Sequence, residues 1–194
     1  QALRVGKRAH AETGIDRAGQ SVVTAALDVA ATHFSDDLHG RSALIVGAGA
    51  MGALSVATLT RAGVGPVRVT NRGADRAARL AEAYGATAVP FADLDAVLRE
   101  VDLVVTATAA AEPVLTRARL EQARPLVVLD LAVPRDVAPD ATDIPDLMVI
   151  DIDGLAASRR ALPAAAETAA VEQIVAAEVE HFLAWLRGAD IAPT

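Results

Sequence analysis

The sequence predicts an α/β fold in which a doubly wound parallel sheet is followed by a long C-terminal helix. From Arg41 onward, short apolar runs alternate with helical patterns, as parallel strands and their crossover helices do. A glycine-rich turn separates the first apolar run from the first helical pattern. The apolar runs do not alternate with polar residues, so we expect strands that are buried on both faces.

Composition limits the classes of protein to which the chain can belong. Its 194 residues are 53% hydrophobic but only 3% aromatic, which predicts one domain with an appended element and an aliphatic core. The net charge of −7 argues against general attraction to nucleic acid or anionic membranes. No apolar stretch is long enough to span a membrane and no signal peptide opens the chain, so we expect a cytoplasmic protein. Cysteine is absent, which excludes a thiolate nucleophile within these residues.

The first half of the chain alternates helices and strands. Small apolar residues recur at helical spacing in Ser21–Phe34, which predicts a helix packed on the sheet. The elements expected next are the strand Ser42–Val46, the helix Ala50–Ala62, the strand Val67–Asn71, the helix Ala74–Tyr84, the strand Thr87–Val89 and the helix Asp93–Arg99. Gly63 and Gly85 follow the two longer helices, and glycine ends many helices because it adopts the left-handed conformation.

The second half completes the sheet and adds the long helix. The expected elements are the strand Leu103–Thr108, the helix Thr116–Gln122 and the strands Leu126–Leu131 and Leu147–Ile150. Six strands with short crossovers are typical of a nucleotide-binding sheet. From about Leu155 to Arg187 we expect one long helix, because apolar residues at helical spacing form a stripe that faces a partner. The stripe consists of Val171, Val175, Val179, Phe182 and Leu186.

The strongest chemical signal is a G-x-G-x-x-G motif placed directly after the first strand and before a helix. It reads Gly47-Ala48-Gly49-Ala50-Met51-Gly52. Gly47 permits the tight turn, Gly49 lets backbone approach a pyrophosphate, and Gly52 lets the helix pack against the strand. The amides of the first helical turn then meet the negative charge of the phosphates. This context predicts a Rossmann-like dinucleotide-binding domain, and the alternative is a merely structural glycine-rich turn.

The end of the second strand indicates which dinucleotide is bound. An acidic residue there would accept hydrogen bonds from the adenosine ribose of NAD, but the sequence has Asn71 followed by Arg72, with Arg76 one helical turn later. A guanidinium offers paired hydrogen bonds to a 2′-phosphate. NADPH is therefore the predicted cofactor, and the alternative is that Arg72 is a solvated loop cation.

Two further stretches follow the carboxyl ends of strands. Thr106, Ala107, Thr108 and Ala109 lie at the carboxyl end of the fourth strand near the topological switch point, and residues 130–136 lie at the end of the fifth; we expect both stretches to line the nicotinamide side of the site. Asp130 ends the fifth strand, and we interpret it as a carboxylate that binds loop amides rather than a catalytic group. Asp151-Ile152-Asp153-Gly154 resembles the start of a calcium loop, but Leu162 stands where the last ligand would be, so no metal site is predicted.

The remaining charged and titratable residues suggest no separate site. The four histidines, His10, His33, His39 and His181, fall on different predicted elements, so we interpret them as surface or packing residues. Four basic residues near the start, Arg4, Lys7, Arg8 and Arg17, are interpreted as a solvated helix face rather than a phosphate-binding patch.

An ordered set of motifs resembles the glutamyl-tRNA reductase family across essentially the whole chain. The opening segment, the run that ends the fifth strand and the end of the last helix are more specific than the glycine motif, which shikimate dehydrogenases share. The motifs are Arg4-Val5-Gly6-Lys7-Arg8, Glu12-Thr13-Gly14-Ile15, Val46 to Gly52, Asn71-Arg72, Asp130-Leu131-Ala132-Val133-Pro134-Arg135-Asp136, Asp151-Ile152-Asp153 and Phe182-Leu183-Ala184-Trp185-Leu186-Arg187. The chain departs from the family at Ala50, commonly acidic, and at Gly73, commonly Thr or Ser, which removes one hydroxyl donor to a 2′-phosphate.

The resemblance implies NADPH-dependent reduction of glutamyl-tRNA to glutamate-1-semialdehyde, the entry to tetrapyrrole biosynthesis. In this family a cysteine of a preceding domain takes the glutamyl group as a thioester, so no catalytic residue carries over to this chain. Residues 1–20 would then end the catalytic domain, 21–154 would bind NADPH, and 155–194 would lead to a dimerisation domain. The resemblance also implies a homodimer and, as partners, glutamyl-tRNA and the aminomutase that follows in the pathway.

Two other functions remain open on the sequence alone. One is a shikimate-dehydrogenase-like NADP oxidoreductase, which would need a catalytic Lys and Asp pair, whereas Lys7 in the opening segment is the only lysine. The other is a module that senses NADPH without catalysing a reaction. By itself, we expect the chain to bind cofactor but not to turn over substrate.

Overall fold

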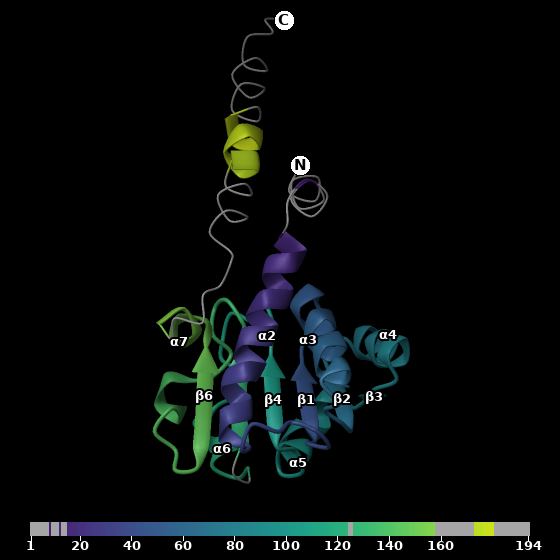
Figure 1. Cartoon of the computed structure of the whole chain (residues 1–194), viewed down its shortest axis with the longest axis vertical. Coiled ribbons are helices and arrows are strands. Elements are labelled where there is room, and N and C mark those ends of the chain that lie inside the picture. Colours follow the sequence, from purple (N-terminus) through teal and green to yellow (C-terminus); the bar gives the residue numbers. More distant parts are fainter. Residues whose placement is uncertain (1–7, 9–11, 13–14, 124–125, 158–172, 181–194) are drawn as a thin grey trace, which may run out of the picture. The chain divides into compact units, whose positions relative to one another are not determined.

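The computed structural model describes residues 8, 12, 15–123, 126–157 and 173–180. The chain divides into two compact units, one formed by residues 1–21 and 161–194 and the other by residues 22–160. The larger unit contains the sheet and its helices (Figure 1). Within the described residues, no helix is both long enough and apolar enough to cross a membrane.

A six-stranded parallel sheet in the order β3-β2-β1-β4-β5-β6 forms the centre of the larger unit. The strands are β1 (Ala43–Val46), β2 (Val67–Thr70), β3 (Thr87–Ala88), β4 (Leu103–Thr106), β5 (Leu126–Asp130) and β6 (Leu147–Asp151). The order reverses between β1 and β4, which is the topological switch point of a Rossmann-like fold. The predicted fold class is confirmed.

Successive residues of β1, β4, β5 and β6 point alternately into two separate cores. In β1, Ala43 and Ile45 pack into one apolar cluster, whereas Leu44 and Val46 pack into the other. The first cluster is covered by α2 (Ile15–His33), α3 (Ala50–Arg61), α4 (Ala74–Tyr84) and α7 (Ile152–Ala157). The second is covered by α5 (Leu94–Leu98) and α6 (Arg117–Leu120). Helices on both faces explain why the strands lack polar alternation.

Most predicted elements lie close to where they were expected, and the larger differences concern a few bounds and two short turns. Helix α2 begins at Ile15, before the predicted Ser21, because the apolar repeat that guided the prediction starts only at Val22. A 3-10 turn, η1 (Phe91–Asp93), precedes α5, and a second one, η2 (Pro139–Ala141), lies in the loop before β6. Strand β4 ends at Thr106 rather than Thr108, and helix α7 directly follows β6 at Ile152, three residues before the helix expected from about Leu155.

The smaller unit is described only in part. Residues 173–180 are helical, as predicted for the long C-terminal helix, and the rest of that helix beyond Ala157 lies outside the described residues. Val175 and Val179 of the predicted stripe are 43% and 50% exposed. Arg8 from the basic opening bonds to Glu12 at 2.7 Å and to Glu178, which is buried, at 2.6 Å. Arg8 is therefore paired within its own unit.

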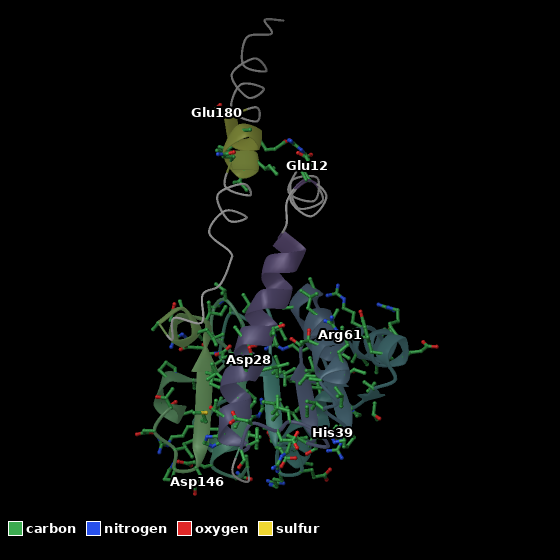
Figure 2. The ribbon with its side chains drawn as sticks, viewed as in Figure 1. Glu12, Asp28, His39, Arg61, Asp146 and Glu180 are labelled. Atoms are coloured by element: carbon green, nitrogen blue, oxygen red, sulfur yellow. The ribbon has the colours of Figure 1, made fainter. Side chains whose placement is uncertain are left out.

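The two histidines within the described part of the chain lie away from the carboxyl edge of the sheet. His39 precedes β1 at the amino ends of the strands, the same edge of the sheet at which Asp146 precedes β6 (Figure 2). His33 ends α2, and both side chains are exposed, as expected for surface residues. His10 and His181 lie outside the described residues.

Candidate dinucleotide-binding site

The glycine-rich turn between β1 and α3 is packed too tightly for side chains at two of its positions. Gly47 has φ +114°, and a Cβ there would lie 2.6 Å from the carbonyl oxygen of Ala107 in the loop after β4. A Cβ on Gly52 would lie 2.2 Å from the carbonyl oxygen of Gly47. Both distances are shorter than any tolerated contact, so these glycines bring the turn against the β4 loop and the first turn of α3.

Gly49 differs from these two glycines because the space beside it is open. It is the N-cap of α3, with φ −90°, and a Cβ built on it would meet nothing within 4 Å. The cap makes no side-chain hydrogen bond, and the first turn of α3, which contains Ala50 and Met51, has no acidic residue. The first amides of a helix need partners and attract anions. The N-terminus of α3 can therefore receive a phosphate that approaches over Gly49.

Asn71 at the end of β2 joins two loops of the site. Its Oδ1 accepts a hydrogen bond from the Ala48 amide at 3.4 Å, and its Nδ2 donates one to the Gly73 carbonyl oxygen at 3.0 Å. A carboxylate could accept the first bond but could not donate the second. The amide therefore suits this geometry better than the aspartate or glutamate of NAD-binding sites would.

Arg72, the next residue, is exposed at the edge of the site. Its Cζ lies 6.0 Å from the centroid of the Phe91 ring, and the structure gives it no carboxylate partner among the described residues. Arg76 is also exposed, in the first turn of α4, but it does not line the pocket at the carboxyl ends of β1, β2 and β4.

A pocket of about 170 Å³ lies at the carboxyl ends of β1, β2 and β4. It brings together four of the predicted residues, Gly47, Asn71, Arg72 and Thr108. The other lining residues are Val46, Phe91, Ala109, Ala110 and Val114. Of these, Val46, Phe91, Ala110 and Val114 were not predicted to line the site, and the place of Phe91 and Val114 depends on loops that only the fold brings together. The pocket lies at the switch point where ligands bind in sheets of this type.

The segment after β4 is organised by Asp136, which the sequence marked only as part of the run from Asp130 to Asp136. Thr106 is completely buried and its hydroxyl donates to the Asp136 carboxylate. Thr106 therefore does not line the pocket, and the expectation that it would was wrong. Ala107 lies against Gly47 through its carbonyl oxygen. Thr108 lines the pocket, and both its amide and its hydroxyl donate to Asp136. These bonds explain why β4 ends at Thr106.

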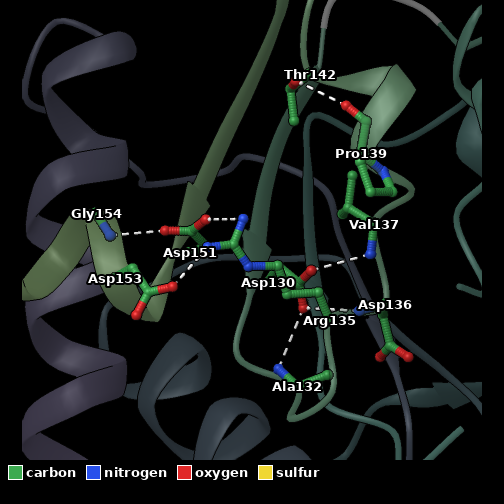
Figure 3. A network of polar contacts seen from close by, with 10 residues as sticks. All are labelled: Asp130, Ala132, Arg135, Asp136, Val137, Pro139, Thr142, Asp151, Asp153 and Gly154. Carbon is green, nitrogen blue, oxygen red and sulfur yellow. Dashed lines mark hydrogen bonds and ion pairs between the residues drawn. The ribbon is translucent and has the colours of Figure 1, made fainter. Parts of the chain in front are cut away.

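Asp130 binds loop amides, as the sequence indicated (Figure 3). Its carboxylate accepts hydrogen bonds from the amides of Ala132 at 3.2 Å, Asp136 at 3.3 Å and Val137 at 2.9 Å. Burial raises the pKa of Asp130, and the amide bonds oppose this shift. The side chain is 1% exposed, so it supports the loop and does not face a ligand.

The carboxylates of Asp151 and Asp153 bind groups of the chain itself. Arg135 pairs with Asp151 at 2.8 Å and with Asp153 at 2.6 Å, and Asp151 also accepts the Gly154 amide at 2.6 Å (Figure 3). These carboxylates hold the start of α7. In the described part of the chain, no cluster of His, Cys, Asp or Glu could hold a metal ion.

A family model described as Shikimate / quinate 5-dehydrogenase matches residues 28–158, which include the whole sheet and the pocket. The chain belongs to this family. The chain is also 67% identical over its whole length to glutamyl-tRNA reductase from Salinispora tropica. It spans only 44% of the length of that curated relative.

Solved structures of the same kind are also similar. The structure of glutamyl-tRNA reductase from Methanopyrus kandleri is similar, with 34% sequence identity and a TM-score of 0.66. The match covers 95% of this chain and 48% of the Methanopyrus chain. Shikimate 5-dehydrogenase from Thermus thermophilus, in complex with NADP(H) and shikimate, matches 73% of this chain and 54% of its own, with 29% identity and a TM-score of 0.52.

These similarities confirm the resemblance drawn from the motifs. The chain is a homologue of glutamyl-tRNA reductase that contains the NAD(P)-binding Rossmann domain of this family. Its sequence contains no cysteine.

Proposed function

We propose that this chain binds NADPH as the cofactor domain of an enzyme that reduces glutamyl-tRNA to glutamate-1-semialdehyde. The proposal is supported by 67% identity to a glutamyl-tRNA reductase and by the pocket at the switch point of the sheet. NADPH would supply the hydride, and the chain's own residues would bind and orient it. The turn Gly47–Gly52 would hold the diphosphate, with Arg72 and Asn71 at the adenosine end.

The choice of NADPH over NADH depends on one observation, the exposed Arg72 guanidinium at the pocket edge without a carboxylate partner among the described residues. A free guanidinium beside the ribose attracts a 2′-phosphate, whereas Asn71 brings no charge that would repel it. The similar shikimate dehydrogenase, whose structure contains NADP(H), agrees with this choice.

The test is the substitution Arg72→Ala, followed by calorimetric titration with NADPH and NADH. Loss of a charge-assisted contact should weaken NADPH binding about 10- to 100-fold and leave NADH binding unchanged. Arg41→Ala is the matched control, because the Arg41 guanidinium lies 4.9 Å from the Phe34 ring centroid but does not line the pocket. Equal affinity of the unsubstituted chain for both cofactors would contradict the proposed preference.

We also propose a division of the chain into parts with different tasks. Residues 21–154 would bind the cofactor, while 1–20 and 155–194 would connect it to a catalytic and a dimerisation domain of a homodimeric enzyme. The chain alone, mixed with glutamyl-tRNA and NADPH, should then form no semialdehyde, because the substrate is not held as a thioester at contact distance from the hydride. Turnover by the chain alone, followed through NADPH absorbance and product, would refute this division.

A further inference from the structure

Asp136 is a buried carboxylate whose hydrogen bonds all serve the segment after β4. It is completely buried, 30 residues from Thr106 in sequence and 28 from Thr108. Its Oδ2 accepts from the Thr106 hydroxyl and, at 2.9 Å, from the Thr108 amide. Its Oδ1 accepts the Thr108 hydroxyl at 2.5 Å. Three donors, two hydroxyls and one amide, converge on this buried side chain, so the segment after β4 has one preferred position.

The bond to Asp136 also decides how the Thr108 hydroxyl can meet a ligand. A hydroxyl has one hydrogen and two lone pairs. Its hydrogen is committed to Asp136, and one lone pair accepts the Ala110 amide at 3.1 Å. Thr108 lines the pocket. The remaining lone pair can accept a hydrogen bond there, but the hydroxyl has no hydrogen left to donate.

The backbone around Asp136 is held as firmly as its side chain. Its amide donates to Asp130, and its carbonyl oxygen accepts the Leu115 amide at 2.9 Å. Leu115 is buried, and Val137 pairs with it in an isolated parallel bridge. The carboxylate therefore presents fixed acceptors to the pocket wall.

We infer that Asp136 is a positioning residue, which fixes the Thr108 hydroxyl as a hydrogen-bond acceptor for a ribose hydroxyl of the bound dinucleotide. This inference rests on the proposed function, because it assumes that the ligand of the pocket is a dinucleotide. The Thr108 hydroxyl would add a polar contact on the side of the pocket formed by β4. Asp136, which does not touch the ligand, would set the orientation of that hydroxyl.

A double-mutant cycle on cofactor affinity tests the inference. The variants of the full chain are Thr108→Val, Asp136→Asn and their combination, titrated with NADPH by calorimetry well below their melting temperatures. Each single substitution should weaken binding about three- to tenfold, because each removes the oriented acceptor. The double variant should bind NADPH with an affinity within about twofold of that of the weaker-binding single variant, since both substitutions break the same interaction. Thr108→Ser, which keeps the hydroxyl, should restore wild-type affinity.

Ser42→Ala is the matched control, because the Ser42 hydroxyl also donates to a carboxylate, Asp102, at 2.7 Å, but at the amino end of the sheet. It should lower stability without changing NADPH affinity. Titration with 2′,5′-ADP locates the contact: weakening with both ligands places it on the adenosine ribose, and weakening with NADPH alone places it on the nicotinamide ribose.

The outcomes separate the inference from the proposed function. If the unsubstituted chain does not bind NADPH, the proposed function fails and the inference fails with it. If the chain binds NADPH but Thr108→Val binds equally well, the inference alone is overturned. Additive losses in the double variant would also overturn it, because Asp136 would then act independently of Thr108. Should Asp136→Asn not fold, the comparison of Thr108→Val with Thr108→Ser still decides.

Discussion

Substitution of Gly47 and Gly49 by alanine should separate folding from cofactor binding within a single turn. At Gly47, alanine would adopt φ +114° and place its Cβ 2.6 Å from the Ala107 carbonyl oxygen. The unfavourable backbone conformation costs about 1 to 3 kcal/mol, and the displacement of packed backbone adds about 1 to 3 kcal/mol. We therefore expect Gly47→Ala to lower the free energy of unfolding by about 2 to 6 kcal/mol, and the melting temperature by on the order of 10 °C.

The same methyl group at Gly49 should have almost no effect on folding. Its φ of −90° suits any residue, and an added Cβ meets nothing within 4 Å. The loss of glycine at the N-cap is offset by the smaller entropy of the unfolded chain, so the free energy of unfolding should change by less than about 1 kcal/mol. The open space is nevertheless where the diphosphate would approach α3, so NADPH affinity should fall roughly tenfold or more, about 1.4 kcal/mol.

Both variants are measured by urea denaturation and by calorimetric titration with NADPH. Gly65→Ala is a control for the Gly49 variant, because a Cβ there also meets nothing within 4 Å and Gly65 does not line the pocket. Equal destabilisation by Gly47→Ala and Gly49→Ala would refute the reasoning, since the close approach would then not distinguish the two positions. Unchanged NADPH affinity in Gly49→Ala would refute the place assigned to the diphosphate.

Two further predictions concern buried polar groups. Asp130→Asn should lower the free energy of unfolding at pH 7 by about 1 to 3 kcal/mol, because one amide oxygen cannot replace two carboxylate oxygens that accept from three amides. Since burial raises the pKa of Asp130, the folded state binds the proton more readily than the unfolded state. The stability of the wild type relative to this variant should therefore increase as the pH falls through the raised pKa, and an increase with rising pH would contradict the sign. Thr70→Val should be neutral or stabilising in urea denaturation, because the buried Thr70 hydroxyl has no hydrogen-bond partner among the described residues. A loss above about 1 kcal/mol would indicate a partner for this hydroxyl.

The sequence predicted the sheet and the glycine turn because both depend on neighbouring residues. Apolar runs buried on both faces, and glycines at fixed spacing between a strand and a helix, are local patterns. The predicted strands lie within two residues of the observed ones at each end. Gly85, predicted to end a helix, adopts φ +66° directly after α4.

What the sequence did not predict depends on contacts between distant segments. Thr106 was expected on the pocket wall, but its side chain turns inward to Asp136 in the loop after β5. No local pattern marks that pairing, although the Asp130 to Asp136 run was noted as a family motif. Phe91 reaches the pocket from the turn after β3, and its neighbour Arg72 comes from the loop after β2. Helix α7 begins at Ile152, three residues before the helix expected from about Leu155, because Arg135 neutralises Asp151 and Asp153 at the helix start.

The loop between Asp130 and Asp136 offers a place for a spectroscopic reporter. Both ends are held by buried carboxylates, while Val133 at its tip is 79% exposed on the same edge of the sheet as the pocket. Because the chain contains no cysteine, Val133→Cys would carry the only thiol available for labelling. A fluorophore or spin label at this position would report the binding of cofactor and could be used to measure distances to a neighbouring domain. The substitution would leave the hydrogen bonds of Asp130 and Asp136 that hold the loop intact.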